Sequence, residues 1–245
     1  MVPGVVALLA PMPLELRPVV RAAGLRPAPD LAGRRHFAGA VGDRPVLAVT
    51  TGIGTRLATE ATEAVLELTV GRGGRIEHVV VVGVAGAVGR RHSVGERIRP
   101  SVVRDAGSGQ SFVPHPVGPP GDRQDGALLT GDELIRDPRR LAALEREGVI
   151  ALDMETAAIA ATCEAQGVRW SVFRAISDVA GDDVVNDSVS GGFARPDGSP
   201  DLAAVARYLA RRPWRARDLG RLARQVQRAA GVAAEDAVRA VAALG

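Results

Sequence analysis

The 245-residue sequence contains no lysine, a single cysteine and few aromatic residues. All 31 basic residues are arginines, and they exceed the 28 acidic residues by only three, so the high isoelectric point reflects arginine rather than a large excess of positive charge. The lone Cys163 excludes an internal disulfide and fits a reducing cytoplasm. Aromatic residues make up 3% of the chain, which disfavours a nucleic-acid ligand, because single strands are bound by stacking bases on aromatic rings.

Long apolar runs are also missing. None reaches the roughly 20 residues that a membrane-spanning helix needs, and residues 5–10 lack the charged start and the cleavage site of a signal peptide. The four histidines show no metal-ligand spacing, and no motif implies a metal or another cofactor. Hydrophobic residues still amount to 46% of the chain, enough to bury the core of one domain. We therefore expect a cytoplasmic protein of one domain.

Short β-branched runs alternate with helical patterns, which is typical of an α/β sheet protein. The patterns predict strands at residues 5–10, 34–41, 45–50, 78–84, 96–104, 149–153 and 170–176. They predict helices at residues 14–24, 55–70, 138–147 and 155–166. Two Gly- and Pro-rich stretches, residues 107–126 and 181–199, are typical of surface loops. The expected fold class is therefore α/β, with one central sheet flanked by helices.

The last part of the chain is predicted to be almost wholly helical. Ser199 is the expected N-cap, with Pro200 at the first helical position and Asp201 complementing the helix dipole. We therefore divide the chain into a main unit, residues 1–199, and a helical extension packed on the same domain, residues 200–245. The polar faces of the extension fit either a solvated surface or weak attraction to an anionic membrane surface. They carry Arg207, Arg211, Arg212, Arg215, Arg217, Arg221, Arg224 and Arg228.

In an open α/β sheet, ligands bind at the carboxyl ends of the strands, so the residues that follow each predicted strand are candidates for a site. Those residues are PMPLE, TGIG, VAGAVG, DME and SD. Glycines let a ligand approach the backbone closely, and Glu15, Glu155 and Asp178 add acidic groups. Each feature alone has a structural explanation, as a tight turn or as a carboxylate at a helix start. Their occurrence together, in this order, indicates one site.

The order APMPLEL, TGIG, VGVAGAVG, SVGERI, TGDELI, LDMETAAIA and FRAISDVA resembles the purine nucleoside phosphorylase/nucleosidase superfamily, especially the methylthioadenosine/S-adenosylhomocysteine nucleosidases, over residues 5–183. The resemblance implies a twisted, mixed central sheet. It also implies that Glu15 activates the attacking water and that Asp178 protonates the purine at N7. Glu155 would bind the ribose hydroxyls, with Met154 against the sugar. Further substrate contacts are implied at Met12, Ile53, Gly54, Ala85, Gly86, Ile135, Asp153, Ser177 and Phe193.

The chemistry agrees with these roles. Cleavage of an N-glycosidic bond builds positive charge on the sugar, which carboxylates stabilise, and negative charge on the base, which an acid neutralises. Asp178 must then stay protonated near neutral pH, so we expect burial to raise its pKa. Water is the expected nucleophile. The phosphorylases of this superfamily carry a phosphate-binding Arg and a Ser or Thr at two positions, which here are Val81 and Val84.

The expected activity is hydrolysis of the N-glycosidic bond of a purine nucleoside. The expected substrate is a 5′-substituted adenosine: methylthioadenosine, S-adenosylhomocysteine or 5′-deoxyadenosine. Leu134 stands where the nucleosidases carry an aromatic residue that stacks on adenine, so the sequence does not decide which purine base the substrate carries. Phe193 is the candidate lid of the 5′ pocket, and the loop around His115 is a candidate contact with a neighbouring subunit in a homo-oligomer, with a dimer favoured. The alternatives are an adenosyl-hopane nucleosidase or phosphorylase, a phosphate-dependent purine nucleoside phosphorylase, and a non-enzymatic nucleoside-binding protein.

Overall fold

A mixed sheet organises the fold, seen here in a computed structural model that describes residues 4–31, 34–68, 74–89, 91–117, 126–135, 137–179 and 193–244. The strands run in the order β2-β3-β4-β1-β5-β10-β9-β7-β8, and β11 pairs with both β5 and β6. Their bounds are β1 Val5–Ala10, β2 Arg26–Leu31, β3 Arg34–Val41, β4 Arg44–Thr50, β5 Ile76–Ala87, β6 Arg97–Ile98, β7 Val102–Asp105, β8 Ser111–Phe112, β9 Ala127–Thr130, β10 Val149–Asp153 and β11 Arg169–Val179.

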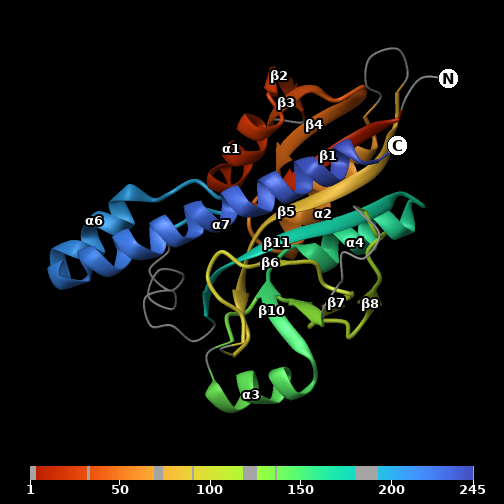
Figure 1. The fold of residues 1–245 in the computed structure, drawn as a ribbon. Helices are drawn as coiled ribbons and strands as arrows, with labels where there is room; N and C mark the ends of the chain where they lie inside the picture. The colour runs from red at the N-terminus through yellow and green to blue at the C-terminus, as the bar shows by residue number, and fades with distance from the viewer. Residues whose placement is uncertain are drawn as a thin grey trace.

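Helices cover both faces of this sheet (Figure 1). They are α1 Pro13–Ala22, α2 Thr55–Leu66, α3 Pro138–Arg146, α4 Thr156–Ala165, α6 Leu202–Arg211, the short 3₁₀ helix η1 Pro213–Arg215 and α7 Ala216–Ala242. Strand β1 shows how the layers form. Its alternate residues Val5, Ala7 and Leu9 pack toward α2 and α4, whereas those between them pack toward α1 and α7. All six residues of β1 are buried, as expected for a strand covered on both faces. The expected α/β fold with flanking helices is confirmed.

Strand direction decides which strand ends meet. Strands β1, β4, β5 and β11 are parallel, so their carboxyl ends share one edge. Strand β10 runs antiparallel to β5, with Leu152 opposite Gly86. Because of this pairing, the carboxyl end of β10 lies beside the carboxyl-terminal part of β5, and Asp153 is brought to the edge that the parallel strands share.

Most predicted elements are confirmed, with shifts of a few residues at their ends. The predicted strand 96–104 is wrong as one element, because Pro100 lies between β6 and β7. The predicted loop 107–126 contains the short strand β8, and residues 118–125 lie outside the described part of the chain. Strands β2 and β9 were not predicted. The predicted loop 181–199 is described only from Phe193 onward.

The N-cap of the first C-terminal helix is Asp201 rather than the predicted Ser199. Its carboxylate accepts a hydrogen bond from the N–H of Ala204, 3.0 Å away, and α6 begins at Leu202. Ser199 instead donates its N–H and its hydroxyl to Asp197, at 2.9 and 2.6 Å. Ser199 is thus used in the turn that precedes the helix, and the division of the chain at residue 199 stays a prediction.

The second half of α7 anchors the extension to the sheet. Its alanines between residues 229 and 240 are buried against β5, β11 and α1. Asp236, which is 3% exposed, accepts hydrogen bonds from Nε and Nη2 of Arg99 at 3.0 and 2.7 Å, and from Arg97 at 3.2 Å. A carboxylate is retained in this apolar layer because arginines satisfy both of its oxygens. Within the described residues, no helix is long and apolar enough to cross a membrane.

Candidate active site

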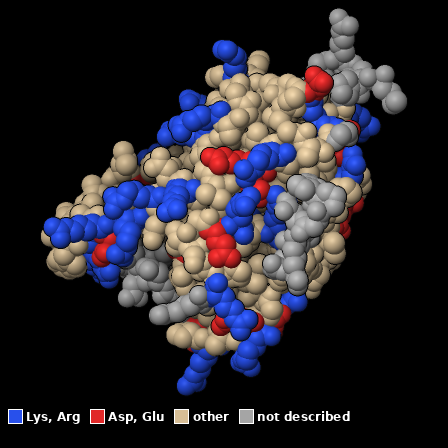
Figure 2. Space-filling view, viewed as in Figure 1, with Lys and Arg blue, Asp and Glu red and all other residues tan. Residues whose placement is uncertain are grey.

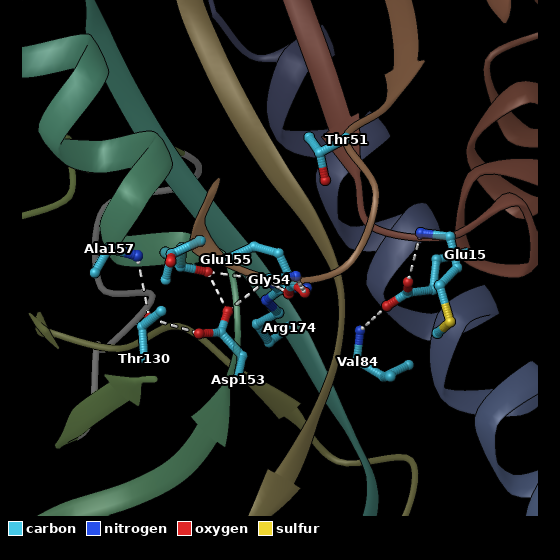
Figure 3. A network of polar contacts seen from close by, with 12 residues as sticks. Glu15, Thr51, Gly54, Val84, Thr130, Asp153, Glu155, Ala157 and Arg174 are labelled. Atoms are coloured by element: carbon cyan, nitrogen blue, oxygen red, sulfur yellow. Dashed lines mark hydrogen bonds and ion pairs between the residues drawn. The ribbon is translucent and has the colours of Figure 1, made fainter. Parts of the chain in front are cut away.

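Arg174, in the middle of β11, is the centre of the polar network in Figure 3. Its side chain is fully buried, and its Nη2 donates to Asp153 at 2.5 Å and to the hydroxyl of Thr156 at 2.9 Å. No role was predicted for this residue from the sequence. The signal was present, however, because an arginine inside the apolar run WSVFRAIS must find an acidic partner if that run is a buried strand.

Asp153 uses both of its carboxylate oxygens within the protein. One accepts a hydrogen bond from the hydroxyl of Thr130 at 2.5 Å, and the other accepts from Arg174 and from the hydroxyl of Thr156. The hydroxyl of Thr130 in turn accepts the N–H of Ala157 at 3.1 Å, at the start of α4. Asp153 therefore ties β9, β10, α4 and β11 together. Its predicted substrate contact stays a prediction.

Glu155 lies at the start of α4 and is 4% exposed. Its Oε1 accepts the N–H of Gly54 at 3.0 Å, and its Oε2 lies 3.8 Å from Arg174. Burial, followed by the nearby Asp153, raises the pKa of Glu155, while Arg174 and the N–H of Gly54 act in the opposite direction. The fold thus brings the TGIG turn and the DME segment together, as the sequence predicted. Met154, between the two acids, is half-buried.

Glu15 lies in the first turn of α1 and is 1% exposed. Its carboxylate accepts the N–H of Met12 at 3.0 Å and the N–H of Val84 at 2.8 Å (Figure 3). Burial raises the pKa of Glu15 to about 7, although Arg174 and the two N–H groups lower it. A carboxylate with this pKa can exchange a proton with water near neutrality.

Gly83 makes the meeting of these groups sterically feasible. A Cβ at this position would overlap both Nη1 of Arg174 and Oε1 of Glu15, so both side chains approach the bare backbone of β5. The buried atoms Nη1 and Nε of Arg174 donate to no acceptor among the described residues. Arg174 therefore holds the acidic network with Nη2 and presents further donors beside Glu15.

Asp178 lies near the end of β11, where a register shift between Ile176 and Asp178 marks a bulge. Such an irregularity re-aims side chains at a strand end. The hydroxyl of Ser177 donates to Asp178 at 2.5 Å and also lies 3.5 Å from the carbonyl oxygen of Ala85. A Cβ at Gly86 would lie 3.1 Å from Oδ2 of Asp178, so the carboxylate covers this glycine. These four predicted positions are close together, and Asp178 is partly exposed.

The segment 193–200 covers the turns that contain Met12 and Ile53. The N–H of Ile53 donates to the carbonyl oxygen of Pro196 at 2.9 Å, and Gly198 packs so closely on Met12 that a Cβ would lie 2.8 Å from its Cα. The ring of Phe193 packs edge-on against Tyr208 of α6, with centroids 5.0 Å apart. The segment therefore packs on both turns, and its role as a lid, like that of Phe193, stays a prediction.

A groove of about 1360 Å³ lies beside the acidic network. It runs between α2, α4 and the TGDELI loop, and its lining includes Leu134, Ile135 and Asp153 but not Glu15, Glu155 or Asp178. Asp132 of this loop accepts the N–H and the hydroxyl of Thr55 at 2.8 and 2.5 Å, which fixes the loop to the start of α2.

His115 lies beside the amino-terminal part of β11, away from Asp178 near the other end of this strand. Its N–H donates to the carbonyl oxygen of Trp170 at 2.7 Å, and its carbonyl oxygen accepts from the hydroxyl of Ser171 at 2.6 Å. Asp178 lies eight positions after Trp170 along β11, roughly 25 Å away at the rise of a strand. Among the described residues, no three His, Cys, Asp or Glu side chains cluster so that they could hold a metal ion.

Comparison with known proteins assigns a family to this arrangement. The model of the phosphorylase superfamily matches residues 5–123 and 121–211. A 5′-methylthioadenosine/S-adenosylhomocysteine nucleosidase of Bacillus thuringiensis is 28% identical over 179 residues, which cover 62% of this chain and 75% of that protein.

Solved structures share the fold. Such a nucleosidase from Colwellia psychrerythraea, in complex with adenine, has a TM-score of 0.72 at 19% identity, with 99% of this chain and 96% of the other covered. Futalosine hydrolase of Helicobacter pylori has a TM-score of 0.66 at 18% identity, with 95% and 97% covered. The order of motifs along the sequence, the mixed sheet and the family match agree: this chain is a member of the phosphorylase superfamily.

Proposed function

We propose that this protein is a nucleosidase that hydrolyses the N-glycosidic bond of a purine nucleoside, with a 5′-substituted adenosine as its substrate. The observation that carries the proposal is the buried Glu15, whose pKa is raised to about 7 and which lies beside two Arg174 donors that have no acceptor in the described part of the chain. The nucleosidase named among its relatives and the adenine bound to the Colwellia enzyme support the choice of reaction and base.

In the proposed reaction, water lies between Glu15 and Arg174. Nη1 of Arg174 and Oε1 of Glu15 form no ion pair with each other among the described contacts, yet a Cβ on Gly83 would lie within 2.5 Å of both atoms. One water oxygen can bridge two atoms placed in this way. Ionised Glu15 takes a proton from this water as the water attacks the sugar. Because the pKa of Glu15 is about 7, the base is active above that pH, and the rate should fall as the pH drops below it.

The remaining acids act on the two halves of the substrate. Glu155, held by the N–H of Gly54, binds the ribose hydroxyls and stabilises the positive charge that develops on the sugar. Asp178 donates a proton to the leaving purine at N7, and the hydroxyl of Ser177 orients its carboxyl group. Met12 and Ile53, under the segment 193–200, form the pocket for the 5′ substituent.

Water is proposed over phosphate because the polypeptide offers a phosphate dianion few partners. Val81 is fully buried in the core, and the N–H of Val84 is used by Glu15. Buried carboxylates would also repel a dianion. Phosphorolysis is the second candidate, and one observation favours it: Nε and Nη1 of Arg174 are donors that suit a phosphate oxygen.

The test is to incubate the dialysed protein with methylthioadenosine, S-adenosylhomocysteine, 5′-deoxyadenosine and inosine, with and without phosphate, and to identify both products. From the three adenosine compounds we expect free adenine and a reducing sugar, at equal rates in both buffers. Sugar 1-phosphate as the main product would establish phosphorolysis instead. Tight binding of a nucleoside with no release of base would establish the nucleoside-binding alternative.

We also propose that the chain forms a homodimer through the groove and the β8 segment. The groove lies next to this segment, which exposes 71% of Val113, and a large exposed apolar side chain beside a groove fits a self-complementary contact. Sedimentation equilibrium should give twice the mass of the chain. Replacing Val113 with Asp should shift the protein toward monomer, and a monomeric unaltered protein would contradict the proposal. A cytoplasmic location remains the expectation.

A further inference from the structure

Part of the helical extension projects from the body of the molecule. Helix α6, η1 and the first half of α7, residues 202–228, extend to one side in Figure 1, and we call them the arm. Of these residues only Ala204 is buried, whereas Ala229 and much of the rest of α7 are packed in the core. The arm is thus an ordered helical element with almost no share in the core, and the match to the family model ends within it, at residue 211.

The charge of the arm is opposite to that of the remainder. It contains eight arginines and one aspartate, a formal charge of +7, whereas the other residues contain 23 arginines and 27 acidic residues, a formal charge of −4. Four of the eight lie four, three and four residues apart on α7, so they share one face of the helix. All four are exposed: Arg217, Arg221, Arg224 and Arg228. Figure 2 shows blue side chains along the part of the surface that the arm occupies.

Apolar side chains are exposed on the same element. Trp214, at the turn between α6 and α7, is 70% exposed, and Leu202 is 72% exposed. Tyr208 is engaged differently, because its ring packs against Phe193 and under the guanidinium of Arg212, 5.2 Å from the ring centroid. A free indole beside arginines on a projecting turn is costly to leave in water and is typical of groups that insert at a membrane interface.

We propose that the arm docks this protein peripherally on an anionic phospholipid bilayer. The exposed arginines of the arm contact the lipid phosphates, and Trp214 enters the interface between headgroups and acyl chains. A bilayer accounts for the charge and for the exposed apolar groups together. Single-stranded nucleic acid is a poorer match, because it requires several free aromatic rings along a groove and the arm presents one ring on a projecting turn.

The first test measures binding to vesicles by flotation at low ionic strength. The unaltered protein should float with vesicles of phosphatidylcholine and phosphatidylglycerol in equal parts, and it should remain unbound with pure phosphatidylcholine. Each basic residue near an anionic leaflet strengthens binding about fivefold, so replacing Arg211, Arg217 and Arg224 with Gln should weaken binding about 100-fold. These three are exposed and make no ion pair in the described part of the chain. Salt at about 0.5 M should release the protein.

A matched control removes the same charge elsewhere. Arg21, Arg26 and Arg35 are exposed near α1, β2 and β3, and replacing them with Gln should change vesicle binding less than about threefold. Both triple variants should keep the circular dichroism spectrum of the unaltered protein and its activity on a free nucleoside. Equal losses of binding in the two triple variants would overturn the proposal, because the arm would then have no special role. No flotation of the unaltered protein with anionic vesicles would also overturn it.

Tryptophan fluorescence distinguishes membrane insertion from attraction to any polyanion. The chain has two tryptophans, and Trp170 is 2% exposed, so a spectral change on binding reports Trp214. Anionic vesicles should shift the emission to shorter wavelength, and a Trp214→Phe variant should bind without this shift. Duplex and single-stranded DNA of equal charge should bind more weakly and leave the emission unchanged. Tighter binding of DNA than of vesicles at the same salt would identify a nucleic-acid surface and refute membrane docking.

Discussion

Glu15→Gln should have opposite effects on activity and on stability. Glu15 is almost completely buried, and its pKa is about 7 in the folded protein against 4.5 for the free side chain. Folding therefore favours its protonated form. Its favourable contribution is fully present below the pKa of the unfolded chain and is lost as the pH rises through the folded pKa. Glutamine has nearly the same shape and carries no charge at any pH, so it removes this loss.

The magnitude follows from the shift in pKa. A change from 4.5 to about 7 corresponds to a cost of about 3 kcal/mol at about pH 8, where Glu15 is ionised. The amide of Gln cannot accept from both Met12 and Val84, so one hydrogen bond is lost, worth about 1 kcal/mol. The variant should thus be about 2 kcal/mol more stable than the unaltered protein at about pH 8, and about 1 kcal/mol less stable below about pH 5. Turnover should fall by about 10²–10⁴, because water loses its base.

Urea unfolding followed by circular dichroism, at several pH values between about 5 and 8, measures this difference. In thermal melts the gain at the upper pH corresponds to a rise in Tm of roughly 4–8 °C. Glu235→Gln, which changes an exposed carboxylate on α7, serves as the control and should leave the stability difference independent of pH. A difference between Glu15→Gln and the unaltered protein that does not change with pH would refute the assignment of a raised pKa to Glu15.

Two further predictions concern β11 and α7. Asp178→Asn should lower turnover of a nucleoside by about 10²–10⁴ but largely spare a nitrophenyl riboside, whose leaving group departs without protonation. Equal losses on the two substrates would mean that Asp178 acts through the structure of the site. Asp236→Asn should lower the free energy of unfolding by about 3–5 kcal/mol, because it removes the buried negative charge that accepts two hydrogen bonds from Arg99. A change in urea-unfolding stability as small as that of Glu235→Gln would show that water compensates for the lost ion pair.

The strands that could be predicted are those whose pattern is local. Residues 5–10 and 149–153 are continuous apolar runs with turn signals after them, and both are strands with the predicted bounds. Strand β2 was missed because its sequence RPAPDL contains two prolines, which normally argue against a strand. The structure places β2 at the edge of the sheet, where a proline that cannot donate a hydrogen bond is tolerated. Edge position is a property of the whole sheet and leaves no local signal.

The positions of the acidic residues in the site followed from strand order, but their partners did not. Glu155 and the N–H of Gly54 are 101 residues apart and meet at 3.0 Å, as expected if segments after different strands share a rim. Asp153 looked equivalent to Glu155 in sequence. In the structure, however, the carboxylate of Asp153 is bound by Thr130, Thr156 and Arg174, so both of its oxygens are used within the protein. Side-chain partners on other strands cannot be read from an apolar run, so this distinction required the structure.

The buried carboxyl groups around Arg174 lower the stability of the folded protein when they are ionised, and the same negative charge can stabilise the transition state. Asp153, Glu155 and Glu15 surround one guanidinium, whose Nη2 is already directed to Asp153. Burial raises the pKa values of the remaining two carboxyl groups, and the single guanidinium only partly offsets this effect. A substrate whose sugar becomes cationic in the transition state supplies the missing positive charge at the moment when the bond breaks. The same burial that destabilises the ionised protein should therefore strengthen its interaction with the transition state more than with the neutral nucleoside. Glu155→Gln should accordingly lower kcat/KM for a neutral nucleoside by more than it weakens binding of that nucleoside, and isothermal titration beside steady-state kinetics separates the two effects.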